Sequence, residues 1–166
     1  MKQFRTLLLI AIITLGFNTA QAQTKVAHIN TDLLLSLMPE TKVLNADLEK
    51  LSKTYETELK AENDKLTAKL KKYEAEVDSQ TDEVNQQRGA EVQQDQQNLY
   101  QASQVAQQDI AKKRDDKLKP ILEKARKAIE DVANAQGFTY VLDASTIIVA
   151  NGTDLLPAVK TKLGIQ

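Results

Sequence analysis

The sequence contains no cysteine and no tryptophan, and its 166 residues include one histidine and only seven aromatic side chains. Without cysteine, the chain can form neither a disulfide scaffold nor a thiolate metal site. A small domain without disulfides depends on long helices, on oligomerisation or on both for its stability. Because aromatic side chains bury large apolar areas, their scarcity argues against an ordinary compact core. We therefore expect an elongated molecule.

Residues 1–22 have the pattern of a cleavable export signal. Two basic side chains near the start precede an apolar run from Leu7 to Phe17, which is too short to span a bilayer. Small residues follow, and we expect cleavage between Ala22 and Gln23. The remaining 144 residues carry 20 basic and 23 acidic side chains. The mature protein is therefore expected to be exported, soluble and mildly acidic.

Residues 40–136 are predicted to form two long helices packed as an antiparallel hairpin. Apolar side chains recur at intervals of eleven residues, which corresponds to about 3.67 residues per turn and a nearly straight apolar stripe. Each helix has one such stripe, and the two are buried most simply against each other. The predicted seam comprises Leu44, Leu48, Leu51, Tyr55, Leu59, Leu66, Leu70, Tyr73 and Val77 on the first helix, and Leu99, Ile110, Leu118, Ile121, Ile129 and Val132 on the second.

Two features interrupt these helices. The turn between them is expected within residues 78–90, either at the helix-breaking cluster 78–82 or at Gly89. Each arm then has roughly 40 residues and projects on the order of 60 Å. Pro120 falls inside the second helix, where it is either a tolerated bend or a hinge.

Residues 23–39 and 137–166 are predicted to form a small β-rich head. The β-leaning segment 25–30 predicts a strand, and a short helix follows it. Two β-branched runs, 138–142 and 146–150, predict a β-hairpin, after which the chain ends in a helix. The predicted fold class is α+β, mostly α, with a long helical hairpin projecting from the head.

Short strands with open edges favour assembly from several chains, because pairing between copies removes the edges. A single copy would be marginally stable. The residues expected to form this assembly head are Val26, Ile29, Phe138, Tyr140, Leu142, Ile147, Ile148 and Val149.

This order of elements resembles the OmpH-like family of periplasmic chaperones over nearly the whole mature chain. The specific parts of the resemblance are the segments 25–30 and 128–154. It implies a homotrimer with a shared β-body and three helical arms around a cavity. It also implies an ATP-independent holdase that binds unfolded outer-membrane proteins there and prevents their aggregation. The best-known member is strongly basic, whereas this chain has a pI near 5.9, so no lipid site is carried over and membrane contact stays open.

Other functions find little support in the residues. His28 is the only histidine and has no nucleophile motif beside it, which favours a structural role over general-base catalysis. We expect no enzyme activity, no cofactor, no metal and no nucleic-acid partner. The segment 85–108 contains ten glutamines and two asparagines, and it is interpreted as a polar arm surface rather than an aggregating tract. The alternative function is a structural coiled-coil adaptor or spacer of the cell envelope.

The signal prediction can be tested by the intact mass of the exported protein. We expect a chain that begins at Gln23, because Ala22 completes the cleavage pattern. A mature chain that still carries Phe17 would contradict this prediction and would indicate a membrane anchor.

Overall fold

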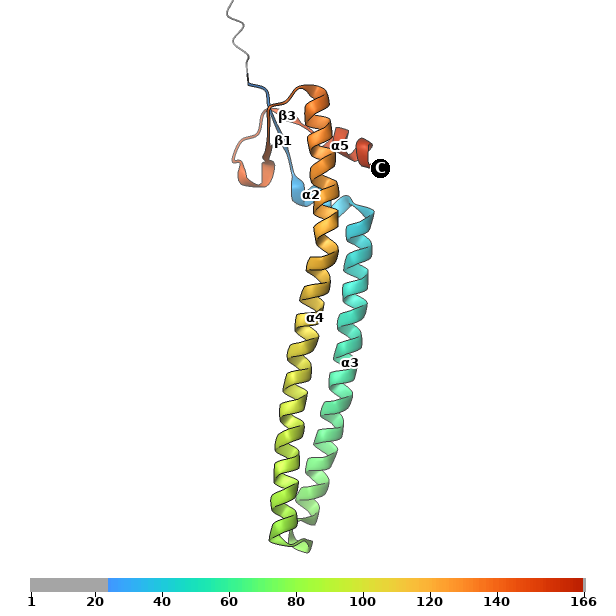
Figure 1. Ribbon diagram of the computed structural model, residues 1–166, viewed down its shortest axis with the longest axis vertical. Coiled ribbons are helices and arrows are strands. Elements are labelled where there is room, and N and C mark those ends of the chain that lie inside the picture. The colour runs from blue at the N-terminus through green and yellow to red at the C-terminus, as the bar shows by residue number, and fades with distance from the viewer. Residues whose placement is uncertain (1–23, 166) are drawn as a thin grey trace, which may run out of the picture.

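The computed structural model describes residues 24–165 (Figure 1). The elements in chain order are β1 (Val26–Ile29), α2 (Thr31–Leu37), α3 (Pro39–Glu76), the 3-10 turn η1 (Val77–Ser79), α4 (Asp82–Gln136), β2 (Tyr140–Asp143), the 3-10 turn η2 (Ala144–Thr146), β3 (Thr153–Asp154) and α5 (Leu156–Leu163). The architecture is α+β and mostly α, as predicted. None of the helices in this part of the chain is both long and apolar enough to span a membrane. The predicted export signal and its cleavage site, Ala22 and Gln23, lie outside the described residues.

Helices α3 and α4 lie side by side and form the arm (Figure 1). Pro39 is at the start of α3, where its fixed φ suits a helix and its missing N–H is not needed. At the far end of the arm the chain reverses through η1, and the Thr81 hydroxyl caps α4 by accepting from the backbone N–H of Val84. Of the two turn candidates, the chain thus reverses at the helix-breaking cluster, and Gly89 lies inside α4.

Helix α4 has 55 residues and α3 has 38. At about 1.5 Å per residue, α4 is on the order of 25 Å longer. The excess extends beyond the start of α3 and forms one side of the head (Figure 1). Because α3 is the shorter helix, the turn lies closer to the N-terminus than the midpoint of the chain segment that forms the two helices.

The head contains a three-stranded parallel sheet in the order β2-β1-β3. Strand β1 pairs with β2 in a register that places Val26 beside Tyr140, and with β3 in a register that places His28 beside Asp154. The central strand therefore comes from the N-terminal segment, and both flanking strands come from the C-terminal one. Pairing across this distance in the sequence joins the two ends of the described chain into one unit.

The predicted β-hairpin of residues 138–142 and 146–150 is wrong. Asp143 explains why, because its carboxylate accepts from the backbone N–H of Ser145 at 3.0 Å and from the Thr31 hydroxyl. These bonds start η2 in place of a hairpin turn, and the chain then leaves the sheet. Residues 147–152 form no strand, and the chain returns as β3 on the other side of β1.

The core of the head lies between the sheet, α2, α4 and α5. Its fully buried side chains are Ile29, Leu34, Met38, Leu155 and Val159. Alanine and valine side chains of α4 complete it, including Ala125, Ala128 and Val132. These small side chains let the neighbouring elements approach α4 closely.

Helix α4 ends at Gly137, which adopts φ +74°. The backbone N–H of Phe138 donates to the carbonyl of Ala133 at 2.9 Å, as in the Schellman motif. Glycine is favoured here because a side chain at positive φ is strained. Gly137 therefore ends α4 directly after Gln136.

Alanine substitutions at two glycines should have opposite effects on stability. Gly137→Ala should lower the free energy of unfolding by about 1–2 kcal/mol, because residue 137 adopts a left-handed conformation. Gly89→Ala should raise it by about 0.4–1 kcal/mol, because position 89 is inside α4 with open space around it. Urea unfolding at one protein concentration measures both, and effects of the same sign would contradict the assignment.

Candidate functional site

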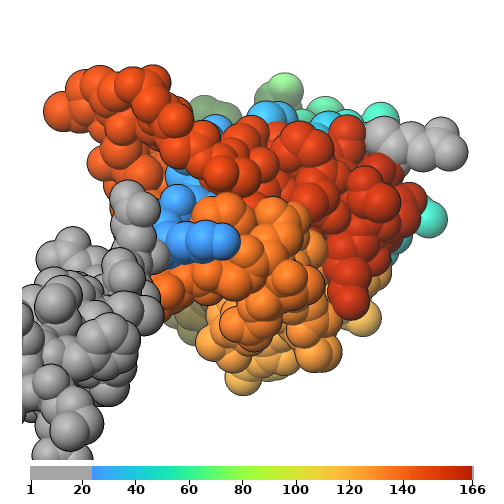
Figure 2. Space-filling model, turned by 90° about the horizontal axis from the view of Figure 1, so that it is seen from above, coloured from blue at the N-terminus to red at the C-terminus, as the bar shows by residue number. Residues whose placement is uncertain are grey.

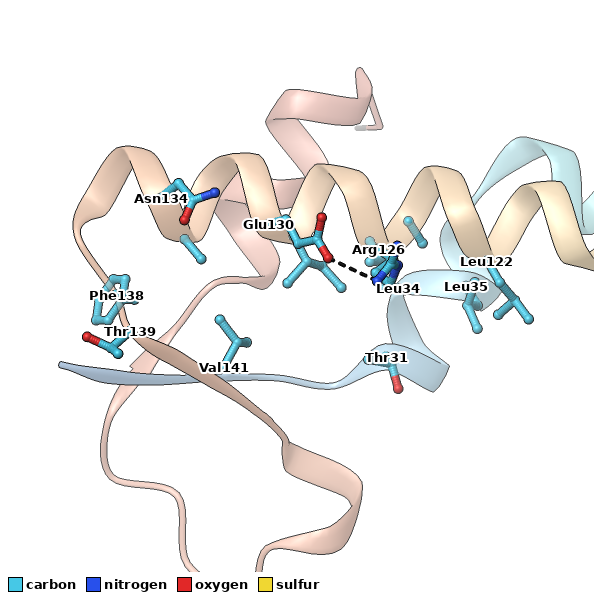
Figure 3. A pocket seen from close by; sticks show the side chains of 13 residues that line it. Thr31, Leu34, Leu35, Leu122, Arg126, Glu130, Asn134, Phe138, Thr139 and Val141 are labelled. Atoms are coloured by element: carbon cyan, nitrogen blue, oxygen red, sulfur yellow. Dashed lines mark ion pairs between the residues drawn. The ribbon is translucent and has the colours of Figure 1, made fainter. Parts of the chain in front are cut away.

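An apolar hollow of the head lies between α4 and the sheet (Figure 3). It has a volume of 570 Å³ and is called here the head groove. Its apolar lining includes Leu35, Leu122, Ile129, Phe138 and Val141. Polar side chains stand at its rim, among them Arg126 and Glu130, which form an exposed ion pair at 3.3 Å. The groove therefore offers apolar contact area rather than acid–base chemistry.

One face of the sheet is covered and the other is open. Ala27 and Ile29 point into the core and are buried, whereas the alternate residue Val26 is exposed. Its register partner on β2, Tyr140, is 59% exposed. Leu142, two residues further along β2, is also exposed. Adjacent parallel strands thus present a row of uncovered apolar side chains, which in an isolated subunit would contact water.

His28 lies on the same open face of β1, in register with Leu142. Its Nε2 is 3.2 Å from the carbonyl oxygen of Gly152, so the ring ties the returning chain to the sheet. Nothing in this contact activates a nucleophile. The structure therefore places His28 in a structural position.

The segment 146–150 contributes further apolar surface. It stands away from one side of the head, as Figure 2 shows from above. Ile148 is fully exposed and Val149 largely so, while Ile147 is half-buried. The expectation that these three residues form a strand in the subunit is wrong, because the chain turns away at Asp143 and reaches no free edge.

The structure places most predicted seam residues between α3 and α4. Leu44, Leu66, Ile121 and Val132 are buried. The half-buried members are Leu48, Leu51, Tyr55, Leu59, Tyr73, Leu99, Ile110, Leu118 and Ile129. Two predicted members are not covered: Leu70 and Val77 are 39% and 46% exposed. The seam therefore loses apolar burial towards the turn.

Ala106 is buried in the arm and was missed by the sequence analysis. It lies seven residues after Leu99, a spacing that places both on one face of α4. This spacing could have identified Ala106 as a seam residue, but the small side chain of alanine contributes little to an apolar pattern. A small side chain at this point allows a close approach of the two helices.

Towards the turn, the two helices are joined by polar side chains. We call this group the arm clasp, and it comprises Lys69, Tyr73, Glu76, Arg88, Glu91 and Asp95. Lys69 Nζ donates to Glu91 Oε1 at 2.7 Å and to Asp95 Oδ2. Tyr73 Oη donates to the other oxygen of Glu91 at 2.8 Å.

Arg88 completes the clasp from the α4 side. Its Nη2 donates to Glu76 Oε2 at 2.6 Å, and its guanidinium carbon lies 4.5 Å from the centre of the Tyr73 ring. The Arg88 side chain is only 18% exposed, so this contact combines a charge-assisted hydrogen bond with cation–π attraction. Sequence analysis missed the clasp, although Lys69 and Glu76 both lie beside seam positions.

The clasp shifts the protonation of its members. Hydrogen bonds from Lys69 and Tyr73 lower the pKa of Glu91 below its ordinary value of 4.5. Hydrogen bonds to Asp95 and Glu91 raise the pKa of Lys69, and the hydrogen bond to Glu91 raises the pKa of Tyr73. Near neutral pH, Lys69 and Glu91 are therefore held in their charged forms.

Comparison with known proteins gives two findings. The family model for outer membrane protein (OmpH-like) matches residues 25–163. The crystal structure of a candidate outer membrane chaperone (OmpH-like) from Caulobacter crescentus CB15 superimposes with a TM-score of 0.75 and 21% sequence identity, over 86% of this chain and 85% of that one. No curated protein matches the chain. At this identity, the likeness to the Caulobacter protein concerns the fold alone.

Removing the lysine of the clasp should loosen the turn end of the arm. Lys69→Met keeps a good helix former but leaves Glu91 and Asp95 without their shared cation. We expect faster amide hydrogen exchange in residues 69–95 and unchanged exchange in the head. Lys71→Met is the matched control, because Lys71 is exposed and forms no ion pair among residues 24–165.

The same region should respond to acid. Because the folded-state pKa of Glu91 is lowered, its contribution to stability is present above the ordinary value of 4.5 and is lost as the pH falls through the folded-state value. Protection factors, corrected for the intrinsic exchange rate, should therefore fall in residues 69–95 below about pH 4.5. Equal protection in Lys69→Met, Lys71→Met and the unmodified chain would contradict the role of the clasp.

Proposed function

The chain belongs to the family of OmpH-like outer membrane proteins, and from this premise we propose that it is an ATP-independent holdase chaperone of the periplasm. It assembles as a homotrimer, binds unfolded outer-membrane proteins in the cavity between its arms and prevents their aggregation. Membership of the family and the chaperone-like fold of the Caulobacter protein support a role in the outer-membrane pathway.

The observation that carries the proposal is the amount of apolar surface that one subunit leaves open in its head. The head groove reaches β2 at Val141, the open face of the sheet includes Tyr140 and Leu142 of the same strand, and the segment 146–150 follows β2 in the chain. Exposed patches of this kind mark protein–protein contacts. Because the arm surface is by contrast mostly charged or polar, we assign assembly to the head, residues 23–39 and 137–166.

A trimer would cover this surface with copies of the same chain. Strand β2 has one edge that no strand of the described chain occupies, and the segment 146–150 is β-branched and unpaired. Pairing of this segment with the edge of a neighbouring copy would satisfy backbone groups and bury Ile148 and Val149. A ring of such contacts leaves no open edge on β2.

Assembly through the head leaves the arms free to enclose a space. Both helices of the arm leave the head in one direction (Figure 1), and α3 alone is on the order of 57 Å long. Three arms around an axis would surround a cavity that can hold an unfolded chain. Retention by several weak contacts requires no nucleotide, and we propose no enzymatic activity for the protein.

The proposal predicts that one substitution in the head abolishes both assembly and chaperone activity. In Ile148→Asp, the new charge is tolerated by the isolated subunit, where position 148 is fully exposed. It would be buried without a partner in the trimer, at a cost of several kcal/mol. We expect sedimentation to report a trimer for the mature protein and a monomer for this variant. Thr67→Asp, which adds the same charge on the exposed arm, should stay trimeric.

Light scattering of an unfolded outer-membrane barrel protein, diluted from denaturant without ATP, tests the activity of the same three proteins. The mature chain and Thr67→Asp should suppress aggregation, whereas Ile148→Asp should not. Trimeric protein that fails to suppress aggregation would overturn the holdase. If crosslinking in cells then captures one folded partner at constant stoichiometry, the protein is an envelope adaptor or spacer.

A further inference from the structure

The middle of α4 contains an uncharged surface in an otherwise charged chain. No charged residue occurs in 96–108, although 27% of the whole sequence is charged. The two carboxylates that border this stretch are both turned towards α3. Asp95 accepts from Lys69, and Asp109 accepts from the Tyr55 hydroxyl at 2.9 Å. The side chains of α4 that face solvent between them are therefore mainly neutral amides.

Tyr100 lies at the centre of this surface and is 67% exposed. A shallow hollow of 440 Å³ surrounds it, lined by Gln93, Gln96, Gln97 and Gln101 as well as Tyr100 itself. The tyrosine takes no part in the seam, although Leu99 beside it does. A large aromatic side chain with two thirds of its surface exposed is available for contact with another molecule.

The same face of α4 leads to the head groove. Tyr100 and Leu118 are eighteen residues apart, which is about five full turns at 3.6 residues per turn. Leu118 packs against the core of the head, and Leu122, one turn further on, lines the groove. Asn98 lies on the opposite flank of α4, where it borders a hollow shared with Glu62 and Lys65 of α3. Charged side chains of α3 thus border the flank at Asn98, whereas the hollow around Tyr100 is lined by uncharged side chains of α4.

We propose that the amide strip, consisting of Gln93, Gln96, Gln97, Tyr100, Gln101 and Gln104, binds the main chain of an extended segment of unfolded polypeptide. This inference rests on the proposed function. If the copies join around the head groove, the face of α4 that contains both Tyr100 and Leu122 is turned towards the enclosed space. The strip would then line each arm on the inside.

The chemistry of the strip suits an unfolded chain. An extended main chain presents N–H donors and carbonyl acceptors that its own fold does not satisfy. A glutamine amide both donates and accepts, so neighbouring glutamines can bond to either group, whereas a carboxylate only accepts. Tyr100 adds apolar contact without demanding a particular client side chain. Main-chain recognition of this kind is weak at each contact and independent of the client sequence.

Site-specific photocrosslinking tests where the client lies. A photoreactive phenylalanine analogue is placed at position 100 or, as a matched control two residues earlier, at position 98 of the full-length mature protein. Both positions are exposed. An unfolded outer-membrane barrel protein should crosslink at position 100 and much less at position 98. Equal crosslinking at the two positions would overturn the amide strip.

Charge substitutions of equal size test the hydrogen-bonding role. Gln93→Glu with Gln97→Glu replaces two amide groups of the strip, each of which donates, by carboxylates that only accept. Asn98→Asp with Ala102→Asp introduces the same charges, at the same four-residue spacing, on the opposite flank, where both residues border the hollow shared with α3. We expect the first pair to weaken client binding about tenfold, or about 1.4 kcal/mol, and the second pair to leave it within about twofold. Circular dichroism and sedimentation confirm that both variants are folded and trimeric.

The outcomes separate this inference from the proposed function. If both pairs weaken binding equally, added net charge explains the loss and the strip is rejected. If neither pair weakens binding and aggregation is still suppressed, the holdase stands and the client is held elsewhere. If the unsubstituted protein binds no unfolded barrel at all, the proposed function fails first.

Discussion

The apolar stripe of α4 is the contact on which both parts of the molecule depend. In the arm it covers the seam of α3, and beyond the start of α3 it carries the sheet, α2 and α5. Its buried members in the head include Ala125, Ala128 and Val132, which are small enough for several elements to pack on one helix. Helix α4 thus joins arm and head, and Leu44 of α3 packs into the same core at the start of the arm.

The means of holding the arm together changes along its length. Near the head, Leu44 and Ile121 are buried and the contact is apolar. Near the turn, Leu70 and Val77 are only partly covered, and the arm clasp joins the two helices. The stabilisation from apolar burial depends neither on pH nor on the direction of the contact. Charge-assisted hydrogen bonds are directional, so they fix the register of the two helices, and their strength changes with the solvent conditions. The turn end of the arm is thus the part most easily opened without unfolding the head.

The open surfaces of the subunit differ in chemistry according to position. The head exposes apolar groups such as Tyr140 and Ile148, which suit permanent burial between copies. The middle of the arm exposes neutral amides around Tyr100, which suit weak and reversible contact. A chaperone that holds a chain and later releases it needs a stable assembly and a low affinity at each binding contact. In the proposed function, these two requirements are met by separate parts of the chain.

The sequence by itself determined the features that depend on neighbouring residues. Helical spacing, Pro39 at a helix start and Gly137 at a helix end act over a few residues, so the two helices and their seam could be predicted. The pairing of the strands could not, because β2 and β3 find their partner β1 more than a hundred residues away. A β-branched run such as 146–150 shows a preference for extended structure but not whether an edge is available. The arm clasp depends on the register of two helices, which the position of the turn decides, and only the tertiary structure brings Lys69 to Glu91 and Asp95.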